Sequence, residues 1–242
     1  MVGFAAAGCQ DVISDMDSVY YNGDGRRVHC AVNIDDSADN SMESLIGGLN
    51  RAAQRGEILE LYGHSPGESF AIGRLGTLLA QAHQRGLPFY TYAQIVRGEA
   101  SGAGVVLSLD DTSIAEWHAT LPLFAQYDAK VTFFISRYAR MFENERQMLR
   151  EIADAGHDLQ AHSVNHLRGP EYVENHGLEA YLIDEVLPSI AVMEADGYPI
   201  SAFAYPFGAR TKEIDRAILE HVPLVRSVAF SMTGPVQDAC PD

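Results

Sequence analysis

Long uninterrupted apolar runs are missing from this chain of 242 residues. A helix needs roughly 18 consecutive apolar residues to cross a membrane, and no stretch reaches that length, so no membrane-spanning segment is predicted. Hydrophobic residues nevertheless make up 47% of the sequence and charged residues 21%, which is typical of a globular protein with a sizeable core. A chain of this length forms one large domain or two small ones.

Positive charge is also scarce. Lys and Arg number 17 against 33 Asp and Glu, which gives a formal net charge of -16. A field of this sign repels phosphate, so tight binding to nucleic acid or to an anionic membrane is excluded. A neutral, cationic or metal-bridged substrate is easier to accommodate.

Cysteine is rare, and its three positions form no metal-binding CxxC pattern. Cys9, Cys30 and Cys240 cannot all pair within one chain. One disulfide with one remaining thiol fits an exported protein, and three reduced thiols fit a cytosolic one. The residues of Phe4–Gly8 resemble the end of a bacterial lipoprotein signal, which would make Cys9 a lipid anchor, but no basic region precedes them. A short apolar start that packs on the fold or frays is the alternative.

Short apolar segments alternate with amphipathic ones, and this alternation predicts a parallel α/β sheet or barrel. The predicted strands are Val28–Ile34, Glu57–Tyr62, Pro88–Tyr90, Val105–Leu109, Lys130–Ile135, Asp158–Ala161, Ala202–Ala204 and Leu224–Ala229. The predicted helices are Ser41–Arg55, Ile72–Arg85, Glu116–Tyr127, Glu145–Ala155, Leu178–Asp196 and Thr211–Glu220. The Gly, Ala and Ser residues of Gly98–Gly104 form the only linker-like stretch.

Two adjacent carboxylates, Asp110 and Asp111, follow directly on the apolar strand that begins at Val105. The carboxyl ends of parallel strands form the functional face of such folds, so this position favours catalysis. Either aspartate could instead cap the helix that begins near Glu116.

A histidine pair follows another short strand. His162 and His166 are four residues apart, and on one helical turn their side chains would lie on the same side. Two imidazoles together with the Asp111 carboxylate can bind one cation and leave positions open for water and substrate, as a catalytic metal site requires.

The turn Pro206–Gly208 follows a third strand, Ala202–Ala204. A turn of this kind can expose backbone N–H groups that stabilise an oxyanion, although ordinary strand-to-helix turns have the same composition.

Together these three segments resemble the motifs of the polysaccharide deacetylase family, carbohydrate esterase family 4. The family's first motif ends in Asp-Asp, its second is His-Ser/Thr-x-x-His and its third contains Pro-Tyr/Phe-Gly. The resemblance implies that Asp110 is the general base and that the Phe207 N–H helps to bind the oxyanion. It also implies that the metal ligands are Asp111, His162 and His166, with Zn²⁺ as the expected ion. Many members place an Arg two residues before the motif Pro to orient the base, but this chain has Ala204, so Arg210 or another cation is expected to substitute.

The remaining family segments stand at the wrong end of the chain. Arg27–Asp36 is similar to a late strand that leads into an acidic fourth motif, and Gly56–His64 is similar to the last motif, whose histidine is the general acid. Ile72–Tyr90 then resembles the closing helix and strand. The resemblance implies that His64 protonates the leaving amine and that Asp35 or Asp36 raises its pKa.

The predicted fold is therefore a distorted (β/α) barrel of about seven strands that is circularly permuted. Residues 1–26 would form an N-terminal extension, residues 27–242 a single barrel, and residues 98–104 the junction of the former termini. On this hypothesis Asp11 and Asp238 are neighbours in space, and His64 faces Asp110. A separate N-terminal domain of about 100 residues is the alternative.

The predicted function is metal-dependent hydrolysis of N-acetyl groups on a glycan, in the periplasm, at the cell envelope or outside the cell. Another amide or ester substrate, or a non-catalytic carbohydrate-binding role, remains open. Trp117, Tyr62, Tyr205 and Phe207 could line a sugar-binding groove, although Trp117 could equally pack its helix onto the barrel. The sequence does not indicate the polymer or the oligomeric state.

Overall fold

A computed structural model describes residues 13–38, 40–229 and 240. The sheet of this part of the chain has nine strands in the order β1-β3-β2-β9-β8-β7-β6-β5-β4. An additional pairing of β3 with β5 closes the seven strands from β3 to β5 into a barrel whose neighbours are all parallel. The predicted (β/α) barrel is confirmed. The strands are β1 (Tyr20–Tyr21), β2 (Val28–Asn33), β3 (Ile58–Gly63), β4 (Phe89–Tyr90), β5 (Gly104–Asp111), β6 (Thr132–Ile135), β7 (Asp158–Ala161), β8 (Ala202–Ala204) and β9 (Leu224–Val228).

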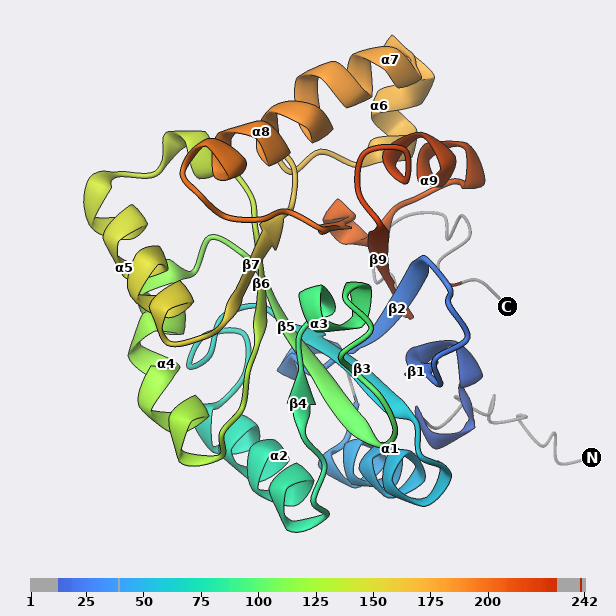
Figure 1. The fold of residues 1–242 in the computed structure, drawn as a ribbon, viewed down its shortest axis with the longest axis vertical. Coiled ribbons are helices and arrows are strands. Elements are labelled where there is room, and N and C mark those ends of the chain that lie inside the picture. The colour runs from blue at the N-terminus through green and yellow to red at the C-terminus, as the bar shows by residue number, and fades with distance from the viewer. Residues whose placement is uncertain (1–12, 39, 230–239, 241–242) are drawn as a thin grey trace, which may run out of the picture.

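Helices surround the barrel (Figure 1). They are α1 (Met42–Arg55), α2 (Ile72–Gln84), α3 (Tyr92–Val96), α4 (Ile114–Gln126), α5 (Glu143–Asp154), α6 (Gly169–His176), α7 (Leu178–Tyr181), α8 (Leu187–Ala195) and α9 (Lys212–Ile218). A π-helical turn, Leu182–Val186, joins α7 to α8. Short 3-10 turns lie at Ile13–Asp15, Asp17–Val19, Asp36–Ala38, Tyr138–Arg140 and Pro206–Gly208. The predicted helices are present within a few residues of their expected ends, whereas α3, α6 and β1 were not predicted.

Two large apolar clusters and a third of three residues, Ala31, Tyr62 and Val228, hold the fold together. The largest cluster lies between the barrel and its helices, and it includes Leu49, Leu79 and Phe133. The second cluster includes Val106, Phe134 and, from α3, the fully buried Tyr92. Because alternate strand residues point to opposite faces, Val106 and Phe134 face the barrel interior, and Tyr92 caps the end where the strands begin. The opposite end is left for the site.

The first described residues pack against the barrel. Ile13, Val19 and Tyr20 are buried, and β1 pairs antiparallel with β3. Strand β2 pairs with β9, so the first and last barrel strands of the chain are neighbours, as the permutation hypothesis requires. The permutation hypothesis also expects Asp11 and Asp238 to be neighbours, but both residues lie outside the described part of the chain. The lipoprotein-like segment and Cys9 lie outside it as well. The permutation stays a prediction.

A disulfide joins Cys30 of β2 to Cys240. It resolves the pairing for two of the three cysteines that the sequence left open. None of the helices in the described ranges combines the length and the hydropathy that a membrane crossing requires.

Candidate metal-dependent active site

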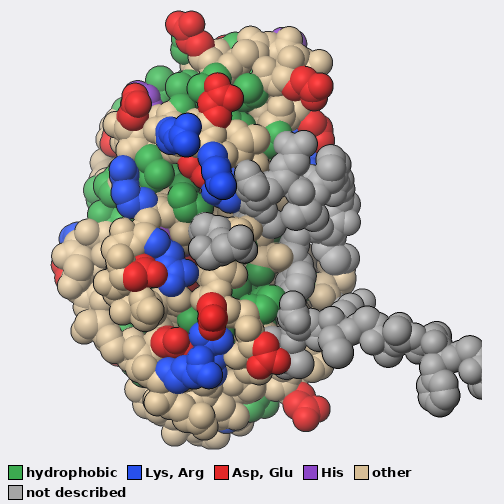
Figure 2. All heavy atoms as spheres, turned by 90° about the vertical axis from the view of Figure 1, so that its right-hand side faces the viewer, with side chains coloured by type: hydrophobic (Ala, Val, Ile, Leu, Met, Phe, Trp, Pro, Cys, Tyr) green, Lys and Arg blue, Asp and Glu red, His purple; other side chains and the backbone are tan. Residues whose placement is uncertain are grey.

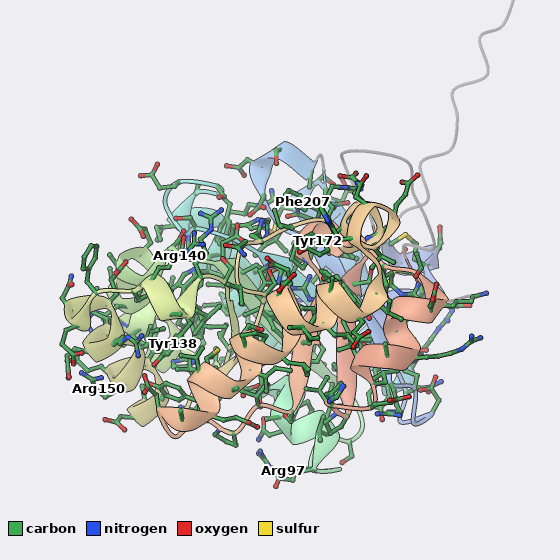
Figure 3. All side chains as sticks on the ribbon, turned by 90° about the horizontal axis from the view of Figure 1, so that it is seen from above. Arg97, Tyr138, Arg140, Arg150, Tyr172 and Phe207 are labelled. Atoms are coloured by element: carbon green, nitrogen blue, oxygen red, sulfur yellow. A yellow bond between two sulfur atoms is a disulfide. The ribbon has the colours of Figure 1, made fainter. Side chains whose placement is uncertain are left out.

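A cavity of about 520 Å³ opens at the carboxyl ends of the barrel strands. Its lining residues come from the ends of β2, β3 and β5, from the segments after β2, β3, β7 and β8, and from β9. They are Asn33, Asp35, Ser37, Tyr62, His64, Glu68, Ser69, Asp110, Asp111, His162, His166, Tyr205, Phe207, Gly208, Arg226 and Val228. Every residue to which the sequence gave a catalytic or metal-binding role therefore lies at one cavity. Figure 3 shows Phe207 on one side of the molecule and Arg97, beyond α3, on the other.

Asp111 stands at the centre of a set of three side chains that could hold a metal ion. One ligand atom each from Asp111, His162 and His166 lies within 4.8 Å of the others. The Asp111 Oδ1 atom is 3.0 Å from Nε2 of His166 and 3.5 Å from Nε2 of His162. Burial raises the pKa of Asp111, but the two imidazoles beside it outweigh burial and hold that pKa well below its usual range.

The chemistry of these donors fits a divalent cation. His162 donates its Nδ1 proton to the carbonyl oxygen of Ala204 at 2.8 Å, because a carbonyl can only accept. Its Nε2 atom is thereby left to face Asp111, and in the neutral imidazole this atom can offer a lone pair to a cation. A backbone contact of this kind fixes the tautomer and orientation of metal-binding histidines. Asp111 Oδ1 is buried and has no hydrogen-bond partner among the described residues, as expected of a ligand atom.

The histidine pair is not helical, which corrects one expectation from the sequence. Residues 162–166 form a loop in which Ser163 has a φ of 71° and His166 a φ of 61°. The Ser163 Oγ atom accepts from the His166 N–H at 2.9 Å. The loop still places the two rings side by side, with centroids 4.9 Å apart.

His64 faces the same metal donors from the end of β3. Its Nε2 atom is 3.9 Å from Oδ2 of Asp111, and its Nδ1 atom is 2.5 Å from Oδ2 of Asp35. Burial lowers the pKa of His64, but the Asp35 hydrogen bond and the charges of Asp110 and Asp111 raise it to about 9. Asp36, the other acid that the sequence offered as a partner of His64, pairs instead with Arg74, whose Nε atom lies 3.8 Å from Asp36 Oδ1.

Gly63 allows the contact between His64 and Asp35. A Cβ atom at position 63 would lie 2.9 Å from Ile34 and Phe70 and 3.2 Å from the Asp35 carboxylate. Close packing around Asp35 therefore accounts for a glycine at this position. Trp117 is fully buried and packs on Phe133, with its indole N–H donating to the His64 carbonyl at 2.8 Å. Of its two predicted roles, the packing role is correct.

Phe207 lies on the rim of the cavity. Its backbone φ is 59°, and its ring is 45% exposed and 4.6 Å from the His166 ring between centroids. The neighbouring Gly208 is required here, because its φ is 65° and a Cβ atom would lie 2.3 Å from Val228. Within the described chain, the Tyr205 and Gly208 N–H groups donate to backbone carbonyls, and no hydrogen bond uses the Phe207 N–H.

Comparisons with known proteins agree with this site. The family model described as polysaccharide deacetylase matches residues 97–223, more than half of the chain. The chain belongs to the polysaccharide deacetylase family. The predicted activity class, a hydrolase that removes N-acetyl groups from a polysaccharide, is confirmed with it.

Three solved structures share the fold. The deacetylase PplD of Streptococcus pyogenes in complex with acetate is 20% identical, with a TM-score of 0.55 over 67% of this chain and 78% of that one. IcaB from Ammonifex degensii is 17% identical, with a TM-score of 0.57 over 76% of this chain and 86% of IcaB. The BpsB deacetylase domain from Bordetella bronchiseptica is 15% identical, with a TM-score of 0.50 over 64% of this chain and 83% of that domain. No curated protein gives a match to the sequence.

This polysaccharide deacetylase supplies the cation beside Asp110 from an unexpected strand. Arg226 of β9 donates from Nη2 to Asp110 Oδ2 at 2.5 Å, and both side chains are buried. Ala204 is the register partner of Arg226 on the neighbouring strand. The guanidinium therefore reaches Asp110 from the position next to Ala204, where many family members carry their Arg.

Arg210, the substitute expected from the sequence, is not that cation. Its guanidinium binds the Asp215 carboxylate, with Nε 2.9 Å from Oδ1. Sequence reasoning missed Arg226, although a single charged residue within the otherwise uncharged and mostly apolar strand Leu224–Val228 is the signal that could have indicated it. Arg226 is held between the rings of Tyr62 and Phe134, at 5.0 and 4.9 Å from their centroids.

Proposed function

We propose that Asp111, His162 and His166 hold a divalent metal ion, with Zn²⁺ as the best match for two imidazoles and one carboxylate. The observation that carries the proposal is the convergence of these three donors on one point beside Asp110. A bound ion of this kind lowers the pKa of water and polarises a carbonyl group. The site residues then divide the proton transfers between them.

Asp110 is the proposed general base. Arg226 engages Oδ2 of its carboxylate, while Oδ1 is buried and has no hydrogen-bond partner in the described chain. The free oxygen takes a proton from water as the water oxygen forms a bond to the acetamide carbon. The Phe207 N–H donates to the oxyanion that develops on the carbonyl oxygen.

His64 is the proposed general acid. Asp35 fixes Nδ1, so the Nε2 proton faces the Asp111 side of the cavity. As the C–N bond breaks, that proton passes to the nitrogen, and the products are acetate and a free amine. A pKa raised to about 9 keeps His64 protonated at neutral pH, as a general acid requires.

The test is Asp110→Asn compared with Asp111→Asn. Acetate release from acetylated chito-oligosaccharides and bound zinc are measured on both variants. Asp110→Asn should lose at least about 100-fold in kcat and keep its zinc, because it removes only the proton acceptor. Asp111→Asn should lose both activity and zinc. Near-normal turnover by Asp110→Asn would disprove the assignment of the base.

The location of the enzyme is proposed to be outside the cytoplasm. The Cys30–Cys240 disulfide supports this, because such bonds persist in oxidising compartments and are rare in the cytosol. An N-acetylated polymer at the cell surface is the matching substrate. The family's Arg is absent at Ala204, but Arg226 makes the contact with Asp110, which supports a catalytic rather than a purely carbohydrate-binding role.

The circular permutation is likewise proposed. The family model begins its match at residue 97, beside the predicted junction of residues 98–104. His64 precedes that matched region in the chain and lies in the same cavity as Asp110. Both observations support a barrel whose final family segments have moved to the start of the chain.

A further inference from the structure

Glu185 is a fully buried carboxylate for which the proposed reaction has no use. It lies on the π-helical turn Leu182–Val186, away from the proposed metal donors in sequence. Burying an ionised carboxylate is costly, and an apolar side chain would serve better if packing were its only task. Its contacts therefore indicate what the carboxylate does.

Both oxygens of Glu185 bind one residue of the metal loop. Oε2 accepts from the backbone N–H of Asn165 at 2.8 Å, and Oε1 accepts from the Asn165 side-chain amide at 2.5 Å. The backbone carbonyl of Glu185 also accepts from the Val164 N–H at 3.0 Å. Three hydrogen bonds thus tie this turn to the two residues directly before His166.

Asn165 is held from its other side by Arg140. The Arg140 guanidinium donates to the Asn165 side-chain oxygen, while the amide nitrogen of Asn165 donates to Glu185. A cation at one end and a carboxylate at the other polarise the amide in the same sense, which strengthens both hydrogen bonds. Arg140 follows β6, Asn165 follows β7, and Glu185 lies in the helical segment beyond α7. Arg140, labelled in Figure 3, lies on the 3-10 turn Tyr138–Arg140.

The loop needs such support. Ser163 and His166 both have a positive φ, a conformation that persists in non-glycine residues only when the surroundings impose it. The π-helical turn is itself a rare conformation that is most often found at functional sites. Two unusual backbone segments therefore meet through one buried carboxylate.

We propose that Glu185 is a positioning residue for the metal site, which holds His166 in place through Asn165. This inference rests on the proposed metal centre of Asp111, His162 and His166. Outer contacts of this kind orient metal ligands, and their loss typically lowers metal affinity 10–100-fold. Glu185 touches neither substrate nor metal.

The experiment measures zinc affinity by chelator competition, starting from the metal-free protein. Glu185→Gln keeps the shape but places an amide N–H₂ against donors, so the zinc affinity should fall about 10–100-fold. Asn165→Ala should give a similar fall, and the double variant should fall little further because both changes break one contact. Glu194→Gln is the matched control: Glu194 lies on α8, is exposed, and should leave the affinity unchanged.

Turnover at saturating zinc separates positioning from a merely structural role. Excess zinc should restore most of the kcat of Glu185→Gln. Wild-type zinc affinity in Glu185→Gln together with a lower melting temperature would overturn the inference and leave only a structural role. If Glu185→Gln fails to fold, Asn165→Ala tests the same contact from the loop. A wild-type protein that binds no zinc would instead disprove the metal centre, and this inference with it.

Discussion

Asp110 and Asp111 are adjacent in sequence, yet their surroundings differ. Asp110 is 2% exposed and binds Arg226, whereas the side chain of Asp111 is 35% exposed and faces two imidazoles. The φ of 86° at Asp111 turns the chain sharply at the end of β5. One dipeptide therefore supplies a buried, oriented carboxylate and an accessible carboxylate that faces the two imidazoles, as the proposed metal site requires.

The position of the cation beside the base can be tested by exchange. Arg226→Ala should lower kcat/KM at least about 100-fold and reduce stability by roughly 3–5 kcal/mol, because it leaves Asp110 buried without a partner. The double change Ala204→Arg with Arg226→Ala should recover part of both losses, since the two positions are register partners. Activity and urea unfolding are measured on the same preparations. A double variant no better than Arg226→Ala would show that position 204 cannot supply the cation.

The pKa of His64 can be tested on the metal-free protein. NMR titration should give a pKa of about 9, and Asp35→Asn should lower it by removing the carboxylate on Nδ1. A raised folded-state pKa stabilises the fold fully below the unfolded value of about 6.5, and this stabilisation is lost as the pH rises through about 9. If His64 titrates near 6.5 in both proteins, the contact with Asp35 does not control its charge.

At the scale of elements, the junction between α5 and β7 buries an unprotonated histidine. His157 packs on Phe124 and Phe133, and its Nδ1 accepts from the Val131 N–H at 3.1 Å. Burial and, secondly, the charge of Lys130 lower the pKa of His157 to about 4. The junction therefore depends on the neutral imidazole.

Acid should weaken this junction. The unfolded chain protonates His157 near pH 6.5 and the folded chain only near pH 4, so the stabilisation is lost as the pH falls through this window. The full loss is about 3 kcal/mol. The difference in unfolding free energy between wild type and His157→Gln should shrink from pH 7 to pH 4. The same change at the more exposed His118, which faces Glu151, is the control, and a pH-independent difference for His157 would contradict the prediction.

At the scale of the whole molecule, the 33 acidic residues outnumber the 17 Lys and Arg residues. On the face shown in Figure 2, Asp and Glu side chains are interspersed with Lys and Arg. The cavity differs, because Asp35, Glu68, Asp110 and Asp111 line it and Arg226 is its only Lys or Arg among the described residues. Such a lining favours a cation and a neutral acetylated sugar over a phosphorylated one.

Metal should stabilise the entire fold. A ligand that binds only the folded state adds about 2.7 kcal/mol at 100 times its Kd, which corresponds to a rise of about 5–10 °C in Tm for a chain of this size. Zinc added to the metal-free protein should produce this rise in wild type and in Asp110→Asn, and much less of it in His166→Ala. An equal rise in all three proteins would place the ion elsewhere.

The sequence by itself determined the barrel strands, because apolar β-branched runs between amphipathic helices leave few alternatives. It also indicated Asp110, Asp111, His162, His166 and Phe207, since these residues lie at or just beyond strand ends that meet at one face and match the motifs of the family. Local patterns could not show the loop conformation at His162–His166, which depends on contacts such as that of Glu185 with Asn165.

Only the tertiary structure decided which distant side chains complete the site. Arg226 reaches Asp110 across 116 positions of sequence, and Asp35 binds His64 across 29. These pairs form because closing the barrel brings Arg226 of β9 within reach of Asp110 on β5 and places β2 beside β3. The energy of such contacts comes from burial and charge pairing in the folded state, which no local spacing encodes.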